Sequence, residues 1–386
     1  MTGLLRGVRV VDLSRVLAGP FAAQVLGEMG ADVIKVEPPE GDTAREVGPH
    51  VDDRSLYYSA LNTNKRGVVL DLKTPEGRRG LEALVDTADI VVENYRPSAI
   101  VKLGLSPPEL IERHPRLVIL TISSYARATD RADEGSFDLV AQAESGIMSV
   151  TGEDGGSPVR AGVAIADLAA GLWGALGAVA AYSLVLREGQ GRHVEVPLLD
   201  SALSLLSYVA TAAMATGVEP GPVGSGHHSI VPYRAYPTND GWVVVAVLGD
   251  KFWAPLCDAI GLEDLKIRSD LRSNARRAAA RDEVDEAIAT ALSHLDTEEA
   301  LDRLAAAGIP HGRLNTILEA LATPYVTSRG LVAQLDSPEG TYGLVRGPLW
   351  DRSTSRPAPS LGEHTLEVMR EVLGPDSPDL LRLVSG

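Results

Sequence analysis

The chain has 386 residues, of which 45% are hydrophobic and 23% charged, a balance typical of globular rather than disordered proteins. Most domains have about 100–200 residues, so this length predicts more than one domain. A net charge of −16 argues against a broad nucleic-acid-binding surface, which needs clustered Lys and Arg. The single cysteine, Cys257, excludes an intrachain disulfide and a multi-cysteine metal site. Residues 1–12 contain no cleavable apolar segment, so we expect a cytoplasmic protein.

The first 125 residues alternate strand-like and helix-like segments. Val- and Ile-rich runs predict strands at residues 8–13, 32–37, 68–72, 90–93 and 117–122. Helices are expected at residues 21–29, which end at Gly30, and at residues 75–85, where Pro75 suits a first helical turn. Nearly continuous apolar strands between helices indicate a parallel sheet covered on both faces. This part of the chain therefore predicts a large Rossmann-like α/β domain.

Two long apolar stretches follow, at residues 168–186 and 201–218. Each is long enough to cross a bilayer, so one interpretation is a transmembrane hairpin. Both are rich in Ala, Gly, Ser and Thr, for which transfer into lipid is weakly favourable, and residues 191–197 between them read as a short strand. We therefore favour two buried helices without membrane contact. Their small residues would allow close backbone approach, as in a large subunit interface.

The composition changes after Val218. Residues 219–226 are rich in Gly and Pro and predict a linker. Beyond it, a strand at 242–247 and helices at 251–260, 278–292 and 297–307 predict a small α+β domain. The tail, with a strand at 342–345 and a helix at 364–373, is too short to form a domain. We expect three segments: 1–218 as the large domain, 219–325 as the linker and small domain, and 326–386 returning to the large domain.

The first strand–helix unit invites a dinucleotide-binding interpretation, with Glu37 as the acid that would bind a ribose hydroxyl. The turn has one glycine, Gly19, where the fingerprint needs three. Pro20 also removes an amide that could bind phosphate. The alternative, a plain strand–helix turn, is favoured.

Two basic clusters are candidates for a site that holds a phosphorylated ligand. They comprise Lys65 and Arg66 before a strand, and Asn94, Tyr95, Arg96 and Lys102 after another. Tyr95 could stack on a flat ring. Because Lys and Arg are usually solvated surface residues, the residues alone leave both interpretations open.

Asp167 opens the long apolar helix and has no charged neighbour for several residues. One interpretation is an N-cap, a role for which Asp is strongly preferred. The other is a nucleophile, held ionised by the helix dipole and free amides and poorly hydrated in an apolar site. The residues alone do not exclude either role.

Residues Gly224, Ser225 and Gly226 form either a linker or a mobile lid that supplies backbone amides to a developing oxyanion. The adjacent His227 and His228 lack the companion ligands of a metal site. A Ser-His-Asp hydrolase is not supported, because the sequence has no Gly-x-Ser-x-Gly elbow.

In order along nearly its whole length, the chain carries short motifs that resemble those of the family III CoA-transferases. This group contains formyl-CoA and carnitine CoA-transferases (the CaiB/BaiF-like proteins) and the alpha-methylacyl-CoA racemases. The motifs include Val-Val-Asp-Leu at 10–13 with Ala-Gly-Pro at 18–20, Gly-Ala-Asp-Val-Ile-Lys-Val-Glu at 30–37, Asn-Lys-Arg at 64–66, Glu-Asn-Tyr-Arg-Pro at 93–97, Gly-Gln-Gly at 189–191 and Ala-Gly-Ile-Pro at 307–310. Each is weak alone, and their order makes the set specific.

The resemblance implies a homodimer of two ring-like chains, each threaded through the other. It also implies transfer of CoA from an acyl-CoA to a carboxylic acid, with no metal, redox cofactor or ATP. Asp167 matches the carboxylate that becomes an aspartyl-CoA thioester, and the loop at 224–226 matches the glycine loop that covers the intermediates. The implied CoA-binding positions are Leu17, Lys65, Arg66, Asn94, Tyr95, Arg96, Lys102 and Asp138.

Three departures from the family pattern bear on the chemistry. Leu17 stands where the formyl-CoA group carries glutamine, and Gly135 and Ser136 replace a basic residue of some relatives. Phe137 stands where the racemases place a histidine, and phenylalanine cannot carry a proton. A CoA-transferase is therefore expected. An acyl-CoA racemase of the same fold and a non-catalytic acyl-CoA-binding protein remain as alternatives.

Overall fold

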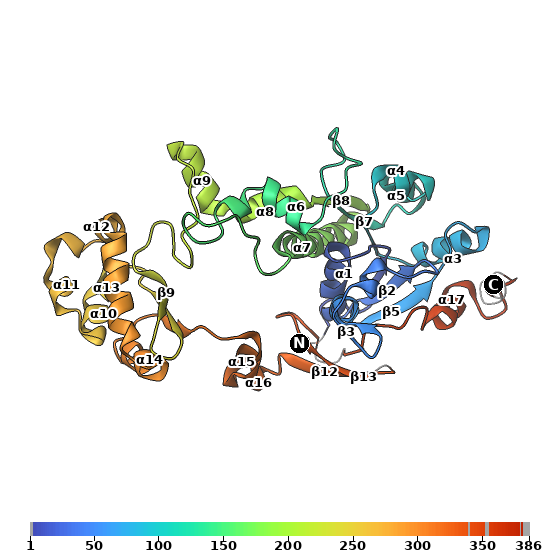
Figure 1. Cartoon of the computed structure of the whole chain (residues 1–386). Helices are drawn as coiled ribbons and strands as arrows, with labels where there is room; N and C mark the ends of the chain where they lie inside the picture. The colour runs from blue at the N-terminus through green and yellow to red at the C-terminus, as the bar shows by residue number, and fades with distance from the viewer. Residues whose placement is uncertain (1–2, 339, 352–354, 379, 381–386) are drawn as a thin grey trace. The chain divides into compact units, whose positions relative to one another are not determined.

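The structure, a computed structural model, describes residues 3–338, 340–351, 355–378 and 380 (Figure 1). The chain forms two compact units. The large unit consists of Met1–Ile147, Arg160–Tyr208 and Thr327–Gly386, and the small unit of Met148–Val159 and Val209–Val326. The small unit thus begins earlier than residue 219 and also takes in a short segment just before the second half of the large unit.

A six-stranded sheet forms the centre of the large unit, with the strand order β5-β2-β1-β6-β7-β8 and parallel pairing throughout. The strands are β1 (Arg9–Asp12), β2 (Asp32–Glu37), β5 (Lys65–Val69), β6 (Ile90–Glu93), β7 (Val118–Ser123) and β8 (Arg192–Pro197). The predicted α/β class with a large parallel sheet is confirmed. β5 was expected at residues 68–72 and begins three residues earlier, so Lys65 and Arg66 lie within the sheet rather than in a loop before it.

Helices cover both faces of this sheet, each over a separate apolar core (Figure 1). One face carries α1 (Ala18–Glu28), α7 (Ile165–Glu188) and α8 (Leu198–Leu205), and the other carries α3 (Pro75–Val85), α4 (Pro97–Lys102), α5 (Pro107–Arg113) and α17 (Thr365–Leu373). The tail supplies α17, which packs on α3 and β5, and the hairpin of β12 (Val332–Ser337) and β13 (Gly340–Val345). The short helix α2 (Leu56–Asn62) packs on α1, and α6 (Asp138–Glu144) packs on α7 and α8.

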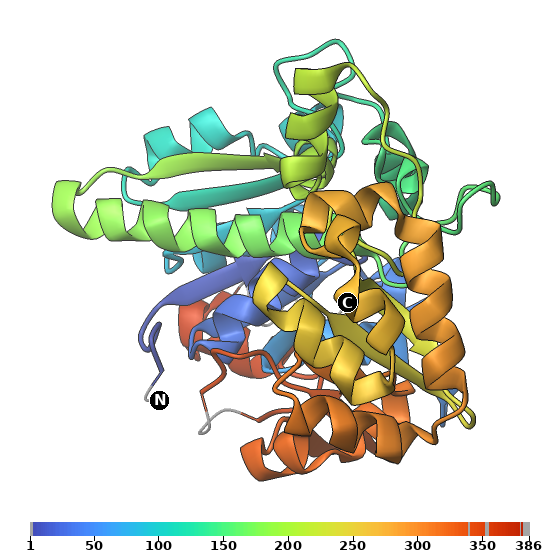
Figure 2. The same ribbon diagram turned by 90° about the vertical axis from the view of Figure 1, so that its left-hand side faces the viewer.

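Helix α7, the first apolar stretch, presents its small residues to its own chain and its large ones to the outside. Its buried positions are Ala166, Ala169, Ala170, Gly171, Gly174, Ala175, Ala178, Ala181 and Val185. Helix α7 packs against α1, β7, β8 and α8, and Figure 2 shows it running alongside the strands β7 and β8. A Cβ on Gly171 would lie 2.9 Å from the carbonyl oxygen of Ala18. Leu172, Trp173 and Leu176 are about half exposed. The buried small residues of α7 therefore serve packing within the chain, and their expected role in a subunit interface stays a prediction.

The second apolar stretch does not form one helix. It is divided into α8 and α9 (Ser207–Thr216), which meet at an angle of 76°, with Ser207 in a left-handed conformation (φ 45°) at the bend. By length and composition α7 could cross a membrane, and so could the bent pair counted as one span. In α7, 44% of the most apolar window is buried inside the protein.

The small unit is built on an antiparallel sheet with the order β11-β10-β9. Its elements are β9 (Tyr233–Pro237), β10 (Trp242–Ala246), α10 (Trp253–Ile260), α11 (Glu263–Ile267), α12 (Asn274–Ala279), α13 (Arg281–Ser293), α14 (Thr297–Ala306), β11 (His311–Arg313) and α15 (Ile317–Ala322). Alternate residues of β10, Val243 and Val245, are fully buried against α10 and α13, which gives this unit its own core.

Candidate active site

A cavity of about 410 Å³ opens at the carboxyl ends of β1, β6 and β7 in the large unit. Open parallel sheets bind ligands at this edge, where loops of several strands converge. The lining residues are Arg15, Val16, Leu17, Ala18, Asn94, Tyr95, Arg96, Ala99, Ile122, Ser123, Ser124, Gly135, Ser136, Phe137, Asp167 and Leu198. The structure thus brings together five of the predicted site residues: Leu17, Asn94, Tyr95, Arg96 and Asp167.

The turn after β1 forms one wall of the cavity, and buried charges hold it in a strained conformation. Val16, a β-branched residue, has a φ of 69°. Its amide donates to Asp42 Oδ1 at 3.2 Å, and Lys35 Nζ donates both to Asp42 Oδ2 (2.9 Å) and to the carbonyl oxygen of Ser14. Because Lys35 and Asp42 are fully buried, this pair fixes the backbone that leads to Leu17, the N-cap of α1.

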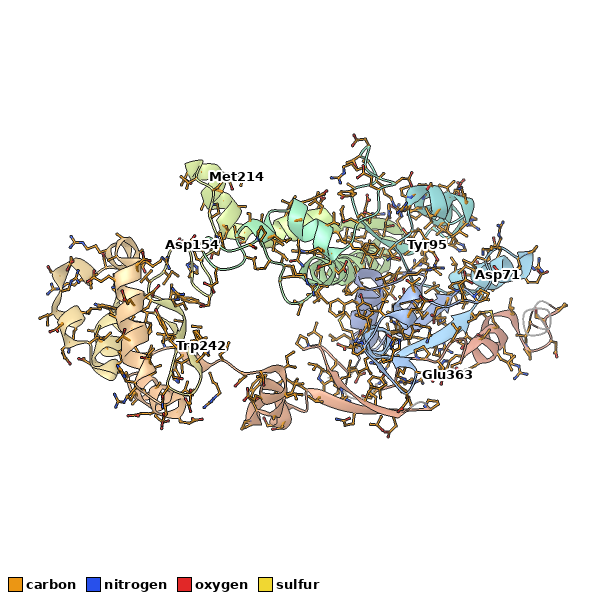
Figure 3. All side chains as sticks on the ribbon, in the orientation of Figure 1. Asp71, Tyr95, Asp154, Met214, Trp242 and Glu363 are labelled. Carbon is orange, nitrogen blue, oxygen red and sulfur yellow. The ribbon has the colours of Figure 1, made fainter. Side chains whose placement is uncertain are left out.

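Asn94 holds the same turn from the other side. Its Oδ1 accepts from the amide of Arg15 at 2.9 Å, and its Nδ2 donates to the carbonyl oxygen of Arg15 at 2.8 Å. The guanidinium of Arg15 lies over the ring of Tyr95, labelled in Figure 3, with its carbon 5.9 Å from the ring centre. Asn94, expected to bind CoA, therefore uses its side-chain amide to position Arg15. Arg15 was missed by the sequence reasoning, although it follows a strand at the ligand-binding edge.

Two arginines supply the positive charge of the cavity. Within the part of the chain that the structure describes, neither Arg15 nor Arg96 forms an ion pair with a carboxylate. Arg96 is the N-cap of α4, and its guanidinium occupies the space that any side chain on Gly135 would need. A basic group from α4 thus lies beside Gly135.

Asp167 lies in the first turn of α7, two residues after the first helical position. The N-cap is Ala164, so the interpretation of Asp167 as the cap is wrong. Burial, and secondly the charge of Asp138, raise the pKa of the Asp167 carboxyl to about 7. The expectation that free amides and the dipole hold this carboxylate ionised is also wrong.

The amides at the start of α7 are occupied by another carboxylate. Asp138 Oδ1 accepts from the amide of Ala166 at 2.9 Å and from that of Asp167 at 3.4 Å. Asp138 Oδ2 accepts from Gln142 Nε2 at 2.6 Å, and Gln142 Oε1 accepts from the amide of Ala161. Asp138, expected among the CoA-binding residues, is buried and does not line the cavity. It caps the helix that carries Asp167.

Tyr57 of α2 is a further neighbour of these acids that the sequence reasoning missed. Burial and the charges of Asp167, Asp42 and Asp138 raise the pKa of its hydroxyl to about 12. The hydroxyl therefore remains protonated at neutral pH and is able to donate a hydrogen bond. No sequence signal marks it, because α2 was not predicted.

Lys65 and Arg66 do not reach the cavity. Lys65 is fully buried, and its Nζ donates to Asp12 Oδ2, the carbonyl oxygen of Pro20 and Asn62 Oδ1 at 2.8, 2.8 and 2.9 Å. Arg66 binds Asp32 and, from the returning tail, Glu367 and Glu371. Both cations are thus used within the fold. Glu37, weighed as a ribose ligand, is bound in the same way by Arg45 and Tyr58.

Lys102, at the end of α4, is exposed and lines a hollow of about 580 Å³ between α3, α4 and α5. A smaller hollow of about 180 Å³, which includes Lys73, joins this one to the cavity that contains Asp167. The joining hollow shares Arg15 and Tyr95 with the cavity, and Leu72 and Leu103 with the larger hollow. The three depressions therefore lie next to one another on the large unit and share lining residues.

The glycine loop belongs to the small unit. Gly224 has a φ of 59°, and its amide donates to the carbonyl oxygen of Gly152 at 2.8 Å. The amide of Gly226 donates to the carbonyl oxygen of Val223, and Ser225 Oγ accepts from the amide of Ala235. Of the three predicted oxyanion donors, only the Ser225 amide therefore lacks a partner among the described residues. Those residues also contain no group of three or more His, Cys, Asp or Glu placed to hold a metal ion.

Comparison with known proteins assigns the chain to a family. Residues 5–365 match the model of CoA-transferase family III. The chain is 38% identical to a succinate–glutarate CoA-transferase of Agrobacterium fabrum over 95% of each chain, and 35% identical to human succinyl-CoA:glutarate CoA-transferase over 99% of this chain and 89% of the human one. A CAIB/BAIF family protein from Brucella suis has a similar fold, with a TM-score of 0.85, 31% identity, and coverage of 96% of this chain and 100% of that one. The chain belongs to CoA-transferase family III and is a CoA-transferase.

Proposed function

We propose that the enzyme transfers CoA from an acyl-CoA to a carboxylic acid through a covalent thioester on Asp167. The Asp167 carboxylate attacks the thioester carbonyl, and CoA thiolate leaves to give a mixed anhydride. The thiolate then attacks the Asp167 carbonyl carbon, the donor acid departs as a carboxylate, and Asp167 carries CoA as a neutral thioester. The acceptor carboxylate repeats these steps in reverse.

The position of Asp167 carries this proposal. Its carboxyl lines the cavity, and no described residue donates a hydrogen bond to it. A carboxylate with few hydrogen-bond donors keeps its electron density for attack on carbon. Its raised pKa, about 7, leaves a large fraction ionised at neutral pH.

The three adjoining depressions support a site for CoA. The thiol end would lie in the cavity beside Leu17 and Asp167, and the chain would pass between Arg15 and Tyr95, where the two hollows meet. Arg96 and Lys102 remain available for the phosphate groups. Lys65 and Arg66 are left out of this proposal, because their donors are already used.

For the acids, we propose short dicarboxylates such as succinate and glutarate, which are named for two of the relatives. A dicarboxylate keeps one negative charge when its other end is bound as a thioester. With Arg96 assigned to phosphate, Arg15 is the other cation of the cavity, and among the described residues it forms no ion pair, so it is the candidate to bind that charge.

We also propose that the protein acts in the cytoplasm as an interlocked homodimer. Large apolar side chains remain exposed on several helices of the single chain: Leu172, Trp173, Leu176, Tyr208, Met214, Ile317 and Leu318. Exposed apolar residues in this number are typical of an interaction surface. The loop at 224–226 would then exclude water from the intermediates, with the Ser225 amide as the free donor.

Mass spectrometry of the intact protein tests the covalent step. Wild-type enzyme mixed with succinyl-CoA should gain the mass of CoA, and hydroxylamine should remove it. Asp167→Asn should gain no mass. A matched control is Asp200→Asn, because Asp200 occupies the same position in the first turn of α8 but is exposed. An unlabelled wild type, or a labelled Asp167→Asn, would refute the proposal.

A second measurement, deuterium uptake by the acyl group in deuterated solvent, separates transfer from racemisation. Phe137 lines the cavity at the position where the racemases resembling this chain carry histidine. A racemase would exchange the α-proton of the acyl group with deuterated solvent and would form no CoA adduct. A non-catalytic binding protein would show neither result.

A further inference from the structure

Asp138 binds the free amides at the start of α7, which would otherwise be available to the carboxylate of Asp167. The first amides of a helix have no partner within the helix and readily bind a carboxylate. In α7, two of them, those of Ala166 and Asp167, donate to Asp138 Oδ1. Gln142 binds the second oxygen of Asp138, so the acid is fixed by its own helix as well. Asp167 is thereby deprived of the donors that would stabilise its charge.

The covalent cycle changes the charge of Asp167 but not that of Asp138. When Asp167 is ionised, its charge lies in a poorly hydrated region near Asp138, which binds the Asp167 amide, and the charge of Asp138 disfavours that ionised state. When Asp167 becomes a thioester, it is neutral, and its negative charge leaves with the donor acid. The repulsion disappears in that step, so it favours the thioester over the free carboxylate.

We propose that Asp138 is a positioning residue whose negative charge drives Asp167 into the covalent state. This inference rests on the proposed thioester mechanism and adds a cause for its equilibrium. Asp138 touches no substrate in this account, because it does not line the cavity. It acts through the start of α7, by occupying the amides and by placing a fixed charge beside the nucleophile.

The other titratable groups around Asp167 do not supply the same effect. Tyr57, from α2, is neutral at neutral pH, because its pKa is about 12. Asp42 also faces Tyr57, but its charge is paired with Lys35. Arg15 and Arg96 line the same cavity and carry the opposite charge. Asp138 is therefore the acid whose removal should change the behaviour of Asp167 most directly.

The test is Asp138→Asn, which keeps an oxygen to cap α7 and removes the charge. Covalent labelling by succinyl-CoA is followed by quenched mass spectrometry between pH 5 and pH 9. In the wild type the rate should rise with a midpoint near 7, and in Asp138→Asn the midpoint should move about one unit lower. At pH 8.5, the equilibrium ratio of thioester to free enzyme in a fixed mixture of succinyl-CoA and succinate should fall about tenfold, because one pKa unit corresponds to a factor of ten.

Asp138→Ser is a second neutral capping variant and should shift both readouts in the same direction. Asp138→Glu restores the charge and should return the midpoint toward 7. Glu144→Gln removes an exposed charge from the same helix and should change neither readout. A purely structural role would lower the rate equally at every pH, and this uniform loss would overturn the proposal. If the wild type forms no adduct at all, the thioester mechanism itself fails, and the role of Asp138 fails with it.

Discussion

Replacing Lys65 with Met should destabilise the large unit and leave CoA binding unchanged. Lys65 Nζ is fully buried, pairs with Asp12, and also binds Pro20 and Asn62. Removing one member of a buried ion pair costs about 3–5 kcal/mol, because the other charge remains uncompensated. Asp12 keeps its hydrogen bonds from Ser14 and the nearby charge of Lys35, which places the expected loss near the lower end, about 3 kcal/mol.

Urea unfolding followed by circular dichroism measures this loss, and equilibrium dialysis with CoA measures binding below the unfolding range. Lys251→Met, at an exposed lysine, is the matched control and should change the free energy of unfolding by less than about 0.5 kcal/mol. A double variant of Lys65→Met with Asp12→Asn should be less destabilised than the sum of the single changes, because the pair is coupled. A tenfold weaker affinity for CoA without a loss of stability would refute the reasoning and return Lys65 to the ligand site.

Three further predictions concern the site and the glycine loop. Transfer activity should rise about tenfold per pH unit below 7 and level off above it, because only ionised Asp167 attacks; a flat profile between pH 5 and 7 would contradict this. Since folding raises the pKa of this acid, its ionisation destabilises the folded state as pH rises through 7, so Asp167→Asn should need more urea to unfold than the wild type at pH 8. Gly224→Ala should lower the protection of the loop amides from hydrogen exchange, because the φ of residue 224 is 59° and the new Cβ would lie 2.6 Å from the Glu153 carboxylate. Adding Glu153→Ala should restore only part of this protection, and full restoration would show that the backbone strain at residue 224 is unimportant.

Much of the large unit could be predicted from its sequence because its parallel strands are nearly continuous apolar runs. β2, α3 and β6 begin and end at the predicted residues. β5 was displaced because Lys65 and Arg66, two charged residues, form its first pairs with β2. A cation inside a sheet needs acids from distant segments, here the buried Asp12 for Lys65 and the exposed Glu367 for Arg66, and no local sequence pattern predicts these pairs.

The sequence predicted which residues lie in or near the candidate site more accurately than it predicted what each residue does there. Asp167, Tyr95 and Arg96 line one cavity, as a common site would require, but Asn94 is engaged with Arg15 and Asp138 with the start of α7. These two roles depend on contacts between residues far apart in the sequence: Asn94 and Arg15 are 79 residues apart, and Asp138 and Ala166 are 28 residues apart. The position of the helix start also excludes the N-cap interpretation of Asp167, because the N-cap is Ala164, three residues earlier in the chain.

The division of α7 into two kinds of surface has a practical consequence for engineering. The glycine and alanine side seals against the enzyme's own sheet, where even a methyl group at Gly171 would collide with α1. The leucine and tryptophan side is solvent-facing in the single chain. Substitutions at Leu172, Trp173 and Leu176 should therefore test the proposed homodimer without disturbing the packing of α7 on the sheet, since none of these three residues belongs to its buried side.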